Sequence, residues 1–336
     1  MAVQGLDLPK LQAYVDEIVP GTGTLSAELL HGGRSNLTYR LTDGTATWVL
    51  RRPPLGGLTP SAHDMKREYT VVAALYGHGV PVAKPIAQSE DPGIIGAPFA
   101  IVEFVPGRTI ATRTQLDTLS DTEVHDCAYA LVDTLAALHA VDPESVGLGS
   151  FGRPAGYLGR QVRRWYDQWT RVSTRPLPDV EALHRWLTEH TPEESGASIV
   201  HGDFRIDNAI VGETDATDVR ALVDWEMSTL GDPLSDLALH VVYSDPAFDP
   251  VLSGGAAATS PRLPSADELV ARYTKASGRE VVNWDFYLGL AYFKIAVIAE
   301  GIHARFVAGQ TVGEGFETVG SAVPDLASAG LRAVRQ

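Results

Sequence analysis

The feature that most constrains this fold is a change of hydrophobic pattern at Pro106-Gly107. Before this dipeptide, short runs rich in strand-forming residues (25–30, 38–42, 47–51 and 97–105) are separated by turn residues, and 61–76 has helical spacing. After it, apolar residues recur every three or four positions over long segments, beginning with 121–140. The pattern predicts an α+β protein with a small antiparallel β-sheet lobe containing one helix (1–102), a hinge (103–107) and a larger, mainly helical lobe (108–336).

The length and composition allow such a fold without cross-links. The 336 residues are 44% hydrophobic and 21% charged, which is enough for a core without disulfides or a structural metal. The single cysteine, Cys127, cannot form an intrachain disulfide, which fits a reducing compartment. Residues 1–20 have no basic start before an apolar run, and no apolar run reaches the roughly 18 residues of a membrane span. We therefore expect a cytoplasmic protein with no membrane partner.

The formal net charge of -15 restricts the partners further. A nucleic-acid-binding face needs Lys and Arg to neutralise phosphates, so no nucleic-acid partner is expected. The acidic balance is compatible with a cationic substrate, but a solvated acidic surface is the favoured explanation, because net charge concerns solubility before site chemistry. Charge therefore excludes one class of partner, and it does not fix the oligomeric state.

Beyond residue 108 the pattern predicts further helices at 158–172, 179–190, 234–243, 265–277 and 284–307. Short apolar strands are predicted at 198–200, 210–211 and 221–223. The segment 244–264, with four prolines and Gly254-Gly255, predicts an exposed loop that covers a cleft. Polar residues directly follow two of the strands, and these residues carry the functional signals.

The first signal is the run from His201 to Asn208, H-G-D-F-R-I-D-N. Protein kinases have a catalytic loop with the same spacing from Asp to Asn. A phosphoryl acceptor needs a carboxylate to orient its hydroxyl and take its proton, and an amide oxygen can bind the Mg²⁺ that accompanies nucleotide phosphates. A loop of this length can point Asp203 and Asn208 into one cleft. An isolated H-G-D is also typical of a tight turn, so the kinase interpretation needs support from residues downstream of the loop.

The second signal is Asp224, which comes directly after the predicted strand 221–223. The Mg²⁺-binding Asp of the kinase set lies at such a strand end. The separation from Asn208 leaves room for a strand, a turn at 212–218 and a return strand. Together the residues predict a phosphoryl-transfer site, with Asp203 as catalytic base and Asn208 and Asp224 as metal ligands.

Three segments resemble the aminoglycoside phosphotransferase family, which includes choline kinase-like and homoserine kinase-like enzymes. They are 201–208, 222–226 (L-V-D-W-E) and 231–238 (G-D-P-L-S-D-L-A). Runs at 48–54, 67–69 and 101–107 resemble, more narrowly, the phosphotransferase domains fused to or associated with acyl-CoA dehydrogenases. The resemblance covers most of the chain. It implies a bilobal protein-kinase-like fold, ATP and Mg²⁺ as cofactors, and the hydroxyl group of a small molecule as acceptor. The narrower resemblance implies that this small molecule is a hydroxy-acyl compound.

The resemblance also implies where the nucleotide binds. The loop 32–36 covers the phosphates, with Ser35 donating from its backbone. Glu103 to Val105 form the hinge whose backbone pairs with adenine. Glu68, in the helix of the first lobe, positions the cation of the third strand. Three further residues, His201, Asp232 and Asp236, are expected to support the catalytic loop and not to react.

One departure from the family pattern concerns the third strand. The family has a Lys there that binds the α- and β-phosphates, but in this chain Leu50 is followed by Arg51-Arg52. Arg also binds phosphate, through a longer and planar group. Strand alternation places Arg51 on the same side as Val49 and Arg52 on the opposite side. We expect Arg51 to pair with Glu68; alternatively, both arginines are surface residues and the phosphates are held by other groups.

The acceptor is expected to bind in the helical lobe. Candidate residues are Trp165, Tyr166, Trp169, Glu300, His303 and Arg305. Packing of the aromatic residues and solvent exposure of the charged ones are the alternative interpretations. A CoA-linked acceptor needs a basic patch, for which 160–164 offers three arginines, whereas an aminoglycoside or other amino-alcohol needs clustered carboxylates. The absent Lys leaves a further alternative, a non-catalytic nucleotide-binding pseudokinase, against which the intact Asp203, Asn208 and Asp224 argue.

Overall fold

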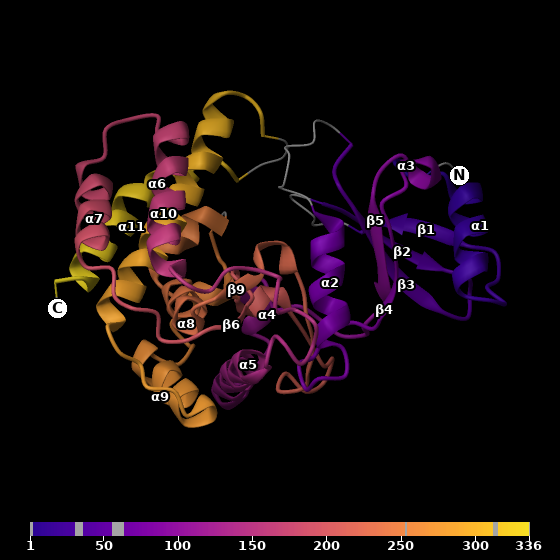
Figure 1. The fold of residues 1–336 in the computed structure, drawn as a ribbon, viewed down its shortest axis with the longest axis horizontal. Coiled ribbons are helices and arrows are strands. Elements are labelled where there is room, and N and C mark those ends of the chain that lie inside the picture. The colour runs from indigo at the N-terminus through magenta and orange to yellow at the C-terminus, as the bar shows by residue number, and fades with distance from the viewer. Residues whose placement is uncertain (1–2, 31–35, 56–63, 253, 312–314, 336) are drawn as a thin grey trace. The chain divides into compact units, whose positions relative to one another are not determined.

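The computed structural model describes residues 3–30, 36–55, 64–252, 254–311 and 315–335 (Figure 1). The chain divides into two compact units. The first contains Met1–Gly107 and the returning segment Arg220–Ser228, and the second contains Arg108–Val219 and Thr229–Gln336. An antiparallel sheet in the first unit and mainly helical structure in the second give the α+β class that the sequence predicts.

The first unit is built on a five-stranded antiparallel sheet with the order β1-β2-β3-β5-β4. Its strands are β1 (Ser26–Leu29), β2 (Leu37–Thr42), β3 (Thr47–Arg52), β4 (Pro85–Ser89) and β5 (Phe99–Glu103). Asp43 closes the turn between β2 and β3, because its Oδ1 accepts the backbone N–H groups of Thr45 and Ala46. This hairpin places β3 at the centre of the sheet.

Among the described residues of the first unit, three α-helices accompany the sheet: α1 (Leu8–Ile18), α2 (Met65–Leu75) and α3 (Pro92–Ile95). The hydrophobic pattern predicts only α2, so α1 and α3 are additional. α1 has ordinary start signals, since the side chain of Asp7 accepts the N–H of Lys10 and Pro9 lies in its first turn.

The core of the first unit lies on the α1 side of the sheet. Leu11 of α1 is fully buried in one cluster with Leu50 of β3. Arg52 is also buried, and its guanidinium donates to the backbone oxygen of Ile95 at 2.9 Å. Because side chains alternate along a strand, Arg51 lies on the opposite face, where it pairs with a side chain of α2. The alternation predicted for the two arginines is therefore correct, and neither of them is a free surface residue.

The second unit is organised around the long helix α10 (Trp284–Val307), which packs against α6, α7, α8 and α11 (Figure 1). Its α-helices are α4 (Arg113–Leu116), α5 (Asp121–Ala140), α6 (Tyr157–Val172), α7 (Pro178–Glu189), α8 (Pro233–Val242), α9 (Ala266–Ser277), α10 and α11 (Val319–Ala333). In the described part of the chain, α10 alone is long and apolar enough to cross a membrane, and 61% of its most apolar window is buried inside the protein.

Short strands and 3-10 helices connect the long helices. In the second unit they are β6 (Ser198–Val200), η1 (Ile206–Asn208), β7 (Ala209–Val211), β9 (Thr229–Gly231), η3 (Pro246–Leu252) and η4 (Ala257–Thr259). The returning segment of the first unit contains η2 (Trp225–Met227) and all but the first residue of β8 (Val219–Leu222). β6 pairs with β9 in an antiparallel ladder, which places the residues after β6 beside those before β9, and the residues after β9 beside those before β6.

The prediction of an exposed loop at 244–264 is wrong. Asp249 organises this segment, because its carboxylate accepts the N–H groups of Gly255 and Ala256 and the hydroxyl of Thr259. The residues Ala256, Ala257, Ala258 and Thr259 are buried. The prolines and glycines here make tight turns that the partly buried carboxylate of Asp249 satisfies, and short apolar side chains fill the space beneath them.

Candidate active site

The catalytic loop predicted at 201–208 follows β6 and ends with η1, and a buried carboxylate fixes its first turn. Asp236, in the first turn of α8, accepts the backbone N–H groups of His201 at 2.5 Å and of Gly202 at 2.8 Å. Burial acts to raise the pKa of Asp236, but the hydrogen bond from His139 and the neighbouring imidazoles lower it below its usual range. The ionised carboxylate therefore supports the loop from beneath, as expected for Asp236.

Asp203 has hydrogen-bond donors on both of its carboxylate oxygens. The hydroxyl of Tyr243 donates to Oδ1, and Nδ2 of Asn208 donates to Oδ2 at 3.0 Å. The Nε of Arg205 lies 3.5 Å from Oδ2. Burial acts to raise the pKa of Asp203, but Arg205, Tyr243 and Lys294 lower it below its usual range. Asp203 is therefore ionised at neutral pH and can accept a hydrogen bond from a hydroxyl group.

Asn208 is oriented by the same loop. Its Nδ2 donates to the backbone oxygen of Asp203 at 2.8 Å as well as to the carboxylate. Both bonds use the amide nitrogen, so the amide oxygen points elsewhere, and within the described residues it accepts no hydrogen bond. An amide oxygen in this position is a hard donor suited to Mg²⁺.

In the first unit, Arg51 bridges two carboxylates. Its Nη1 lies 2.7 Å from Oε2 of Glu68, and its Nη2 lies 3.2 Å from Oδ1 of Asp224. Nδ2 of Asn36 donates to the other oxygen of Glu68 at 3.1 Å. Burial acts against the charge of Arg51, but the two carboxylates outweigh it and raise its pKa, while burial raises the pKa of Glu68 to about 7. The ion pair between Arg51 and Glu68 is present as the sequence predicts.

Asp224 has an unusual backbone. Its φ and ψ angles of 67° and 58° lie in the left-handed region, which residues other than glycine seldom adopt. The next residue, Trp225, is buried and donates Nε1 to the backbone oxygen of Leu222 at 3.0 Å. Such strain persists only where the surroundings hold it, and it is concentrated at functional sites.

The remaining residues predicted to bind nucleotide are less informative. Ser35 lies outside the described residues. β5 ends at Glu103, whose backbone N–H donates to the backbone oxygen of Lys84 at 2.9 Å. The backbone N–H of Phe104 donates to the backbone oxygen of Thr47 at 3.1 Å. The N–H of Val105 donates no hydrogen bond within the described part of the chain. This geometry leaves a backbone donor for adenine, and the roles of Glu103 and Val105 stay predictions.

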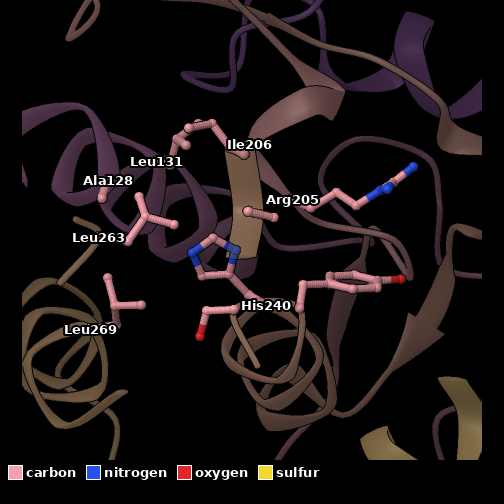
Figure 2. Close-up of a pocket in the computed structure, with 10 residues that line it drawn as sticks. Ala128, Leu131, Arg205, Ile206, His240, Leu263 and Leu269 are labelled. Atoms are coloured by element: carbon pink, nitrogen blue, oxygen red, sulfur yellow. The ribbon is translucent and has the colours of Figure 1, made fainter. Parts of the chain in front are cut away.

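A small cavity lies behind the catalytic loop (Figure 2). It has a volume of about 20 Å³, room for roughly one water, and its lining includes His240, Leu131 and Leu269. Burial lowers the pKa of His240 to about 4, so this imidazole is neutral, and its Nδ1 lies 3.3 Å from the backbone oxygen of Phe204. The cavity is too small for a substrate, and we regard it as a small unfilled space between the catalytic loop and the residues that pack behind it.

The candidate acceptor residues fall into two groups. Glu300 is fully buried and accepts the N–H and hydroxyl of Thr174, with Arg175 3.2 Å away. The hydroxyl of Tyr166 and the indole N–H of Trp169 both donate to Glu181. The contacts of Tyr166 and Trp169 connect α6 to α7. The contacts of Glu300 connect α10 to the segment that follows α6. Trp165 differs, because its ring lies 5.5 Å from the ammonium of Lys294.

Tyr243 and Lys294 are the functional candidates that sequence patterns miss. Tyr243 immediately follows α8, where nothing in the spacing distinguishes it from a core aromatic residue. Lys294 has a recognisable signal, since it is the only charged residue between Asp285 and Glu300 in an apolar helix. A lone charge in such a stretch indicates a buried partner.

An ionised aspartate on an H-G-D-x-x-x-x-N loop, in a chain with an antiparallel sheet unit and a helical unit, defines the class of kinase-like phosphotransferases. The family model described as "Phosphotransferase enzyme family" matches residues 26–269, and the chain belongs to this family. It is 37% identical to human acyl-CoA dehydrogenase family member 11, over 97% of this chain and 43% of that protein. The chain thus spans about two fifths of the length of this curated relative.

Solved structures agree with this assignment. A Ralstonia eutropha protein, provisionally named an aminoglycoside phosphotransferase, is 34% identical, with a TM-score of 0.84 and 98% of both chains covered. The aminoglycoside phosphotransferase APH(4)-Ia, in a complex with AMP-PNP and hygromycin B, is 15% identical, with a TM-score of 0.60 over 96% of this chain and 98% of that one. The similarity to APH(4)-Ia is a similarity of fold alone, and it establishes the kinase-like fold of this chain.

Proposed function

We propose that this protein transfers the γ-phosphoryl group of ATP to a hydroxyl group of a small molecule. The observation that carries the proposal is the carboxylate of Asp203, which is ionised and held in one orientation by Tyr243 and Asn208. A carboxylate prepared in this way orients the acceptor hydroxyl and takes its proton as the new phosphate bond forms. Most of the catalysis then comes from positioning and charge neutralisation.

The donor atoms fit Mg²⁺ as the accompanying ion. The amide oxygen of Asn208 and a carboxylate oxygen of Asp224 are hard ligands, and we propose both for the metal. The described residues contain no cluster of three or more His, Cys, Asp or Glu side chains that could hold a metal. This composition suits Mg²⁺ bound with ATP, because that ion takes few protein ligands and completes its shell with phosphate oxygens and water.

Arg51 is the cation that we propose for the ATP phosphates. Its guanidinium is already held by Glu68, and in kinases the Lys at this strand is held by a helix Glu in the same way. Of the five N–H groups of Arg51, one faces Glu68 and one faces Asp224, so three remain that can bind phosphate. This geometry supports catalysis over the pseudokinase alternative, whose only support is the exchange of Lys for Arg. AMP-PNP in the APH(4)-Ia complex supports the choice of an adenine nucleotide.

For the acceptor we propose an anionic hydroxy-acyl compound. Arg205 and Lys294 both act on the Asp203 carboxylate, so the reacting hydroxyl meets positive charge. Arg163 and Arg164 of α6 are exposed, and Arg164 acts on Lys294. Both observations favour an acid or a CoA thioester, and the likeness to an acyl-CoA dehydrogenase family member is consistent with it. An aminoglycoside is the alternative, supported by the provisional name of the Ralstonia protein, but it would bring like charges to this surface.

The test compares acceptors directly. Purified protein is first tested for thermal stabilisation by ATP and Mg²⁺, then incubated with hydroxy-acyl-CoAs, free hydroxy acids and aminoglycosides while the acceptor mass is followed. We expect a gain of one phosphate on an anionic hydroxyl compound. Asp203→Asn should lower kcat by roughly 10²–10⁴-fold with little change in ATP stabilisation. Stabilisation by ATP without transfer to any acceptor would favour a pseudokinase.

A further inference from the structure

Lys294 is placed where a lysine is costly. It lies in the apolar middle of α10, half-buried between α6 and the catalytic loop. Its ammonium donates to the backbone oxygen of Gly202 at 2.5 Å and lies 5.5 Å from the ring of Trp165. A buried ammonium is retained only where partners compensate for the lost water.

The charged groups that act on Lys294 come from three elements. Asp203 in the loop and Asp236 in α8 favour its charge, while Arg164 in α6 opposes it. Burial is the largest influence, and it lowers the pKa of Lys294 to about 8. The protonated and neutral forms of this side chain therefore both occur near physiological pH.

The contact with Gly202 controls the residue that reacts. Gly202 has a φ of 82°, and its N–H is held by Asp236 at 2.8 Å. Its carbonyl belongs to the peptide bond that leads directly into Asp203, and this carbonyl is held by Lys294. The two contacts hold successive peptide planes of the loop, one through an N–H and the other through a C=O. An ammonium in this position fixes the direction of the Asp203 backbone and adds positive charge near its carboxylate.

We propose that Lys294 is a positioning residue for phosphoryl transfer: its protonated ammonium holds the Gly202–Asp203 peptide and keeps the Asp203 carboxylate aligned toward the acceptor. This inference rests on the proposed function of Asp203. When Lys294 loses its proton, the nitrogen keeps two N–H bonds but loses the charge that holds the carbonyl. Activity should therefore have an alkaline limb that begins near pH 8. Tyr243 does not produce this limb, because burial and the neighbouring Asp203 raise its pKa well above 10.

A direct titration tests the first half of the inference without any acceptor. Trace acetic anhydride labels each lysine in proportion to its unprotonated fraction, and peptide mass spectrometry reads Lys294 and the exposed Lys275 in the same sample. We expect the labelling of Lys294, normalised to its own plateau, to reach half its maximum near pH 8. A midpoint near the ordinary lysine value of 10.5 would overturn the inference, whether or not the protein transfers phosphate.

Two variants test the second half. Lys294→Met keeps the length of the side chain and removes the charge, so we expect kcat to fall about 10²-fold at pH 7 with less than a threefold change in the KM for ATP. Its alkaline limb should disappear. Lys294→Arg should keep the charge and move the limb to higher pH. Melting temperatures serve as the control for folding, because a merely structural role would lower stability without changing the pH profile.

The outcomes separate the two proposals. If wild-type protein transfers phosphate and Asp203→Asn abolishes it, an unchanged alkaline limb in Lys294→Met overturns the role of Lys294 alone. If wild-type protein transfers phosphate to none of the acceptors tested, the proposed function fails, and the labelling experiment still decides whether Lys294 titrates near pH 8.

Discussion

The replacement Asp236→Asn tests whether a buried carboxylate holds the catalytic loop. In the native protein, its two oxygens accept the N–H groups of His201 and Gly202 at 2.5 and 2.8 Å. Asparagine has nearly the same shape, but only its oxygen can accept. One of the two backbone N–H groups must then face an NH₂ group, which is itself a donor.

The expected cost comes from this change. A hydrogen bond to a charged acceptor contributes about 1.5–3 kcal/mol, and a buried N–H left without an acceptor costs a further ~1–3 kcal/mol. We therefore expect Asp236→Asn to lower the free energy of unfolding by about 3–5 kcal/mol. Since the first turn of the loop moves, kcat should fall by about 10²-fold even at temperatures where the variant is folded.

Urea unfolding followed by tryptophan fluorescence measures the first effect, and transfer assays at low temperature measure the second. Asp325→Asn is the matched control, because Asp325 is exposed on α11 and should change stability by less than about 0.5 kcal/mol. A loss of less than about 1 kcal/mol for Asp236→Asn would refute the reasoning, since it would mean that the carboxylate is not needed to satisfy the loop.

Three further predictions concern Arg51, His240 and Glu300. Arg51→Met should weaken ATP binding about tenfold or more in isothermal titration, whereas Arg51→Lys should restore most of it, because the phosphates need a cation beside Glu68. His240 has a pKa of about 4 in the folded protein and about 6.5 when unfolded, so it contributes stability above pH 6.5 that is lost as the pH falls toward 4. Between pH 7 and pH 5 this loss should be about 2 kcal/mol in urea unfolding, and His240→Gln should not show it. Glu300→Gln should lower stability by about 1–3 kcal/mol without changing the KM for any acceptor, because Glu300 binds Thr174 and not a ligand.

The sequence predicts those parts of the site whose chemistry is local. The spacing of Asp203 and Asn208 is a property of one short loop, so the pattern alone brings them together. The pairing of Arg51 with Glu68 is a consequence of strand alternation and one helix. Such relations need few assumptions about how distant segments pack.

The rest depends on tertiary contacts that leave little trace in the sequence. Tyr243 reaches Asp203 only because α8 ends beside the catalytic loop, and an aromatic residue at a helix end is usually part of a core. The segment 244–264 contains turn residues, but the carboxylate of Asp249 and a run of alanines bury it. Composition identifies the turns and gives no information about whether they face water.

Lys294 is an intermediate case, and its charge behaves differently from that of Arg51. In the first unit, Glu68 and Asp224 raise the pKa of Arg51, so the charge of Arg51 itself is fixed across the physiological range. Lys294 of α10, which contacts the catalytic loop, has a pKa of about 8, so its charge depends on the molecule that enters the site. An anionic acceptor beside Asp203 would raise that pKa and complete the charge that aligns the loop. A cationic acceptor would lower the pKa and release the loop. The same side chain would thus both favour anionic hydroxyl compounds and reject amino-alcohols, by coupling the charge of the acceptor to the alignment of Asp203.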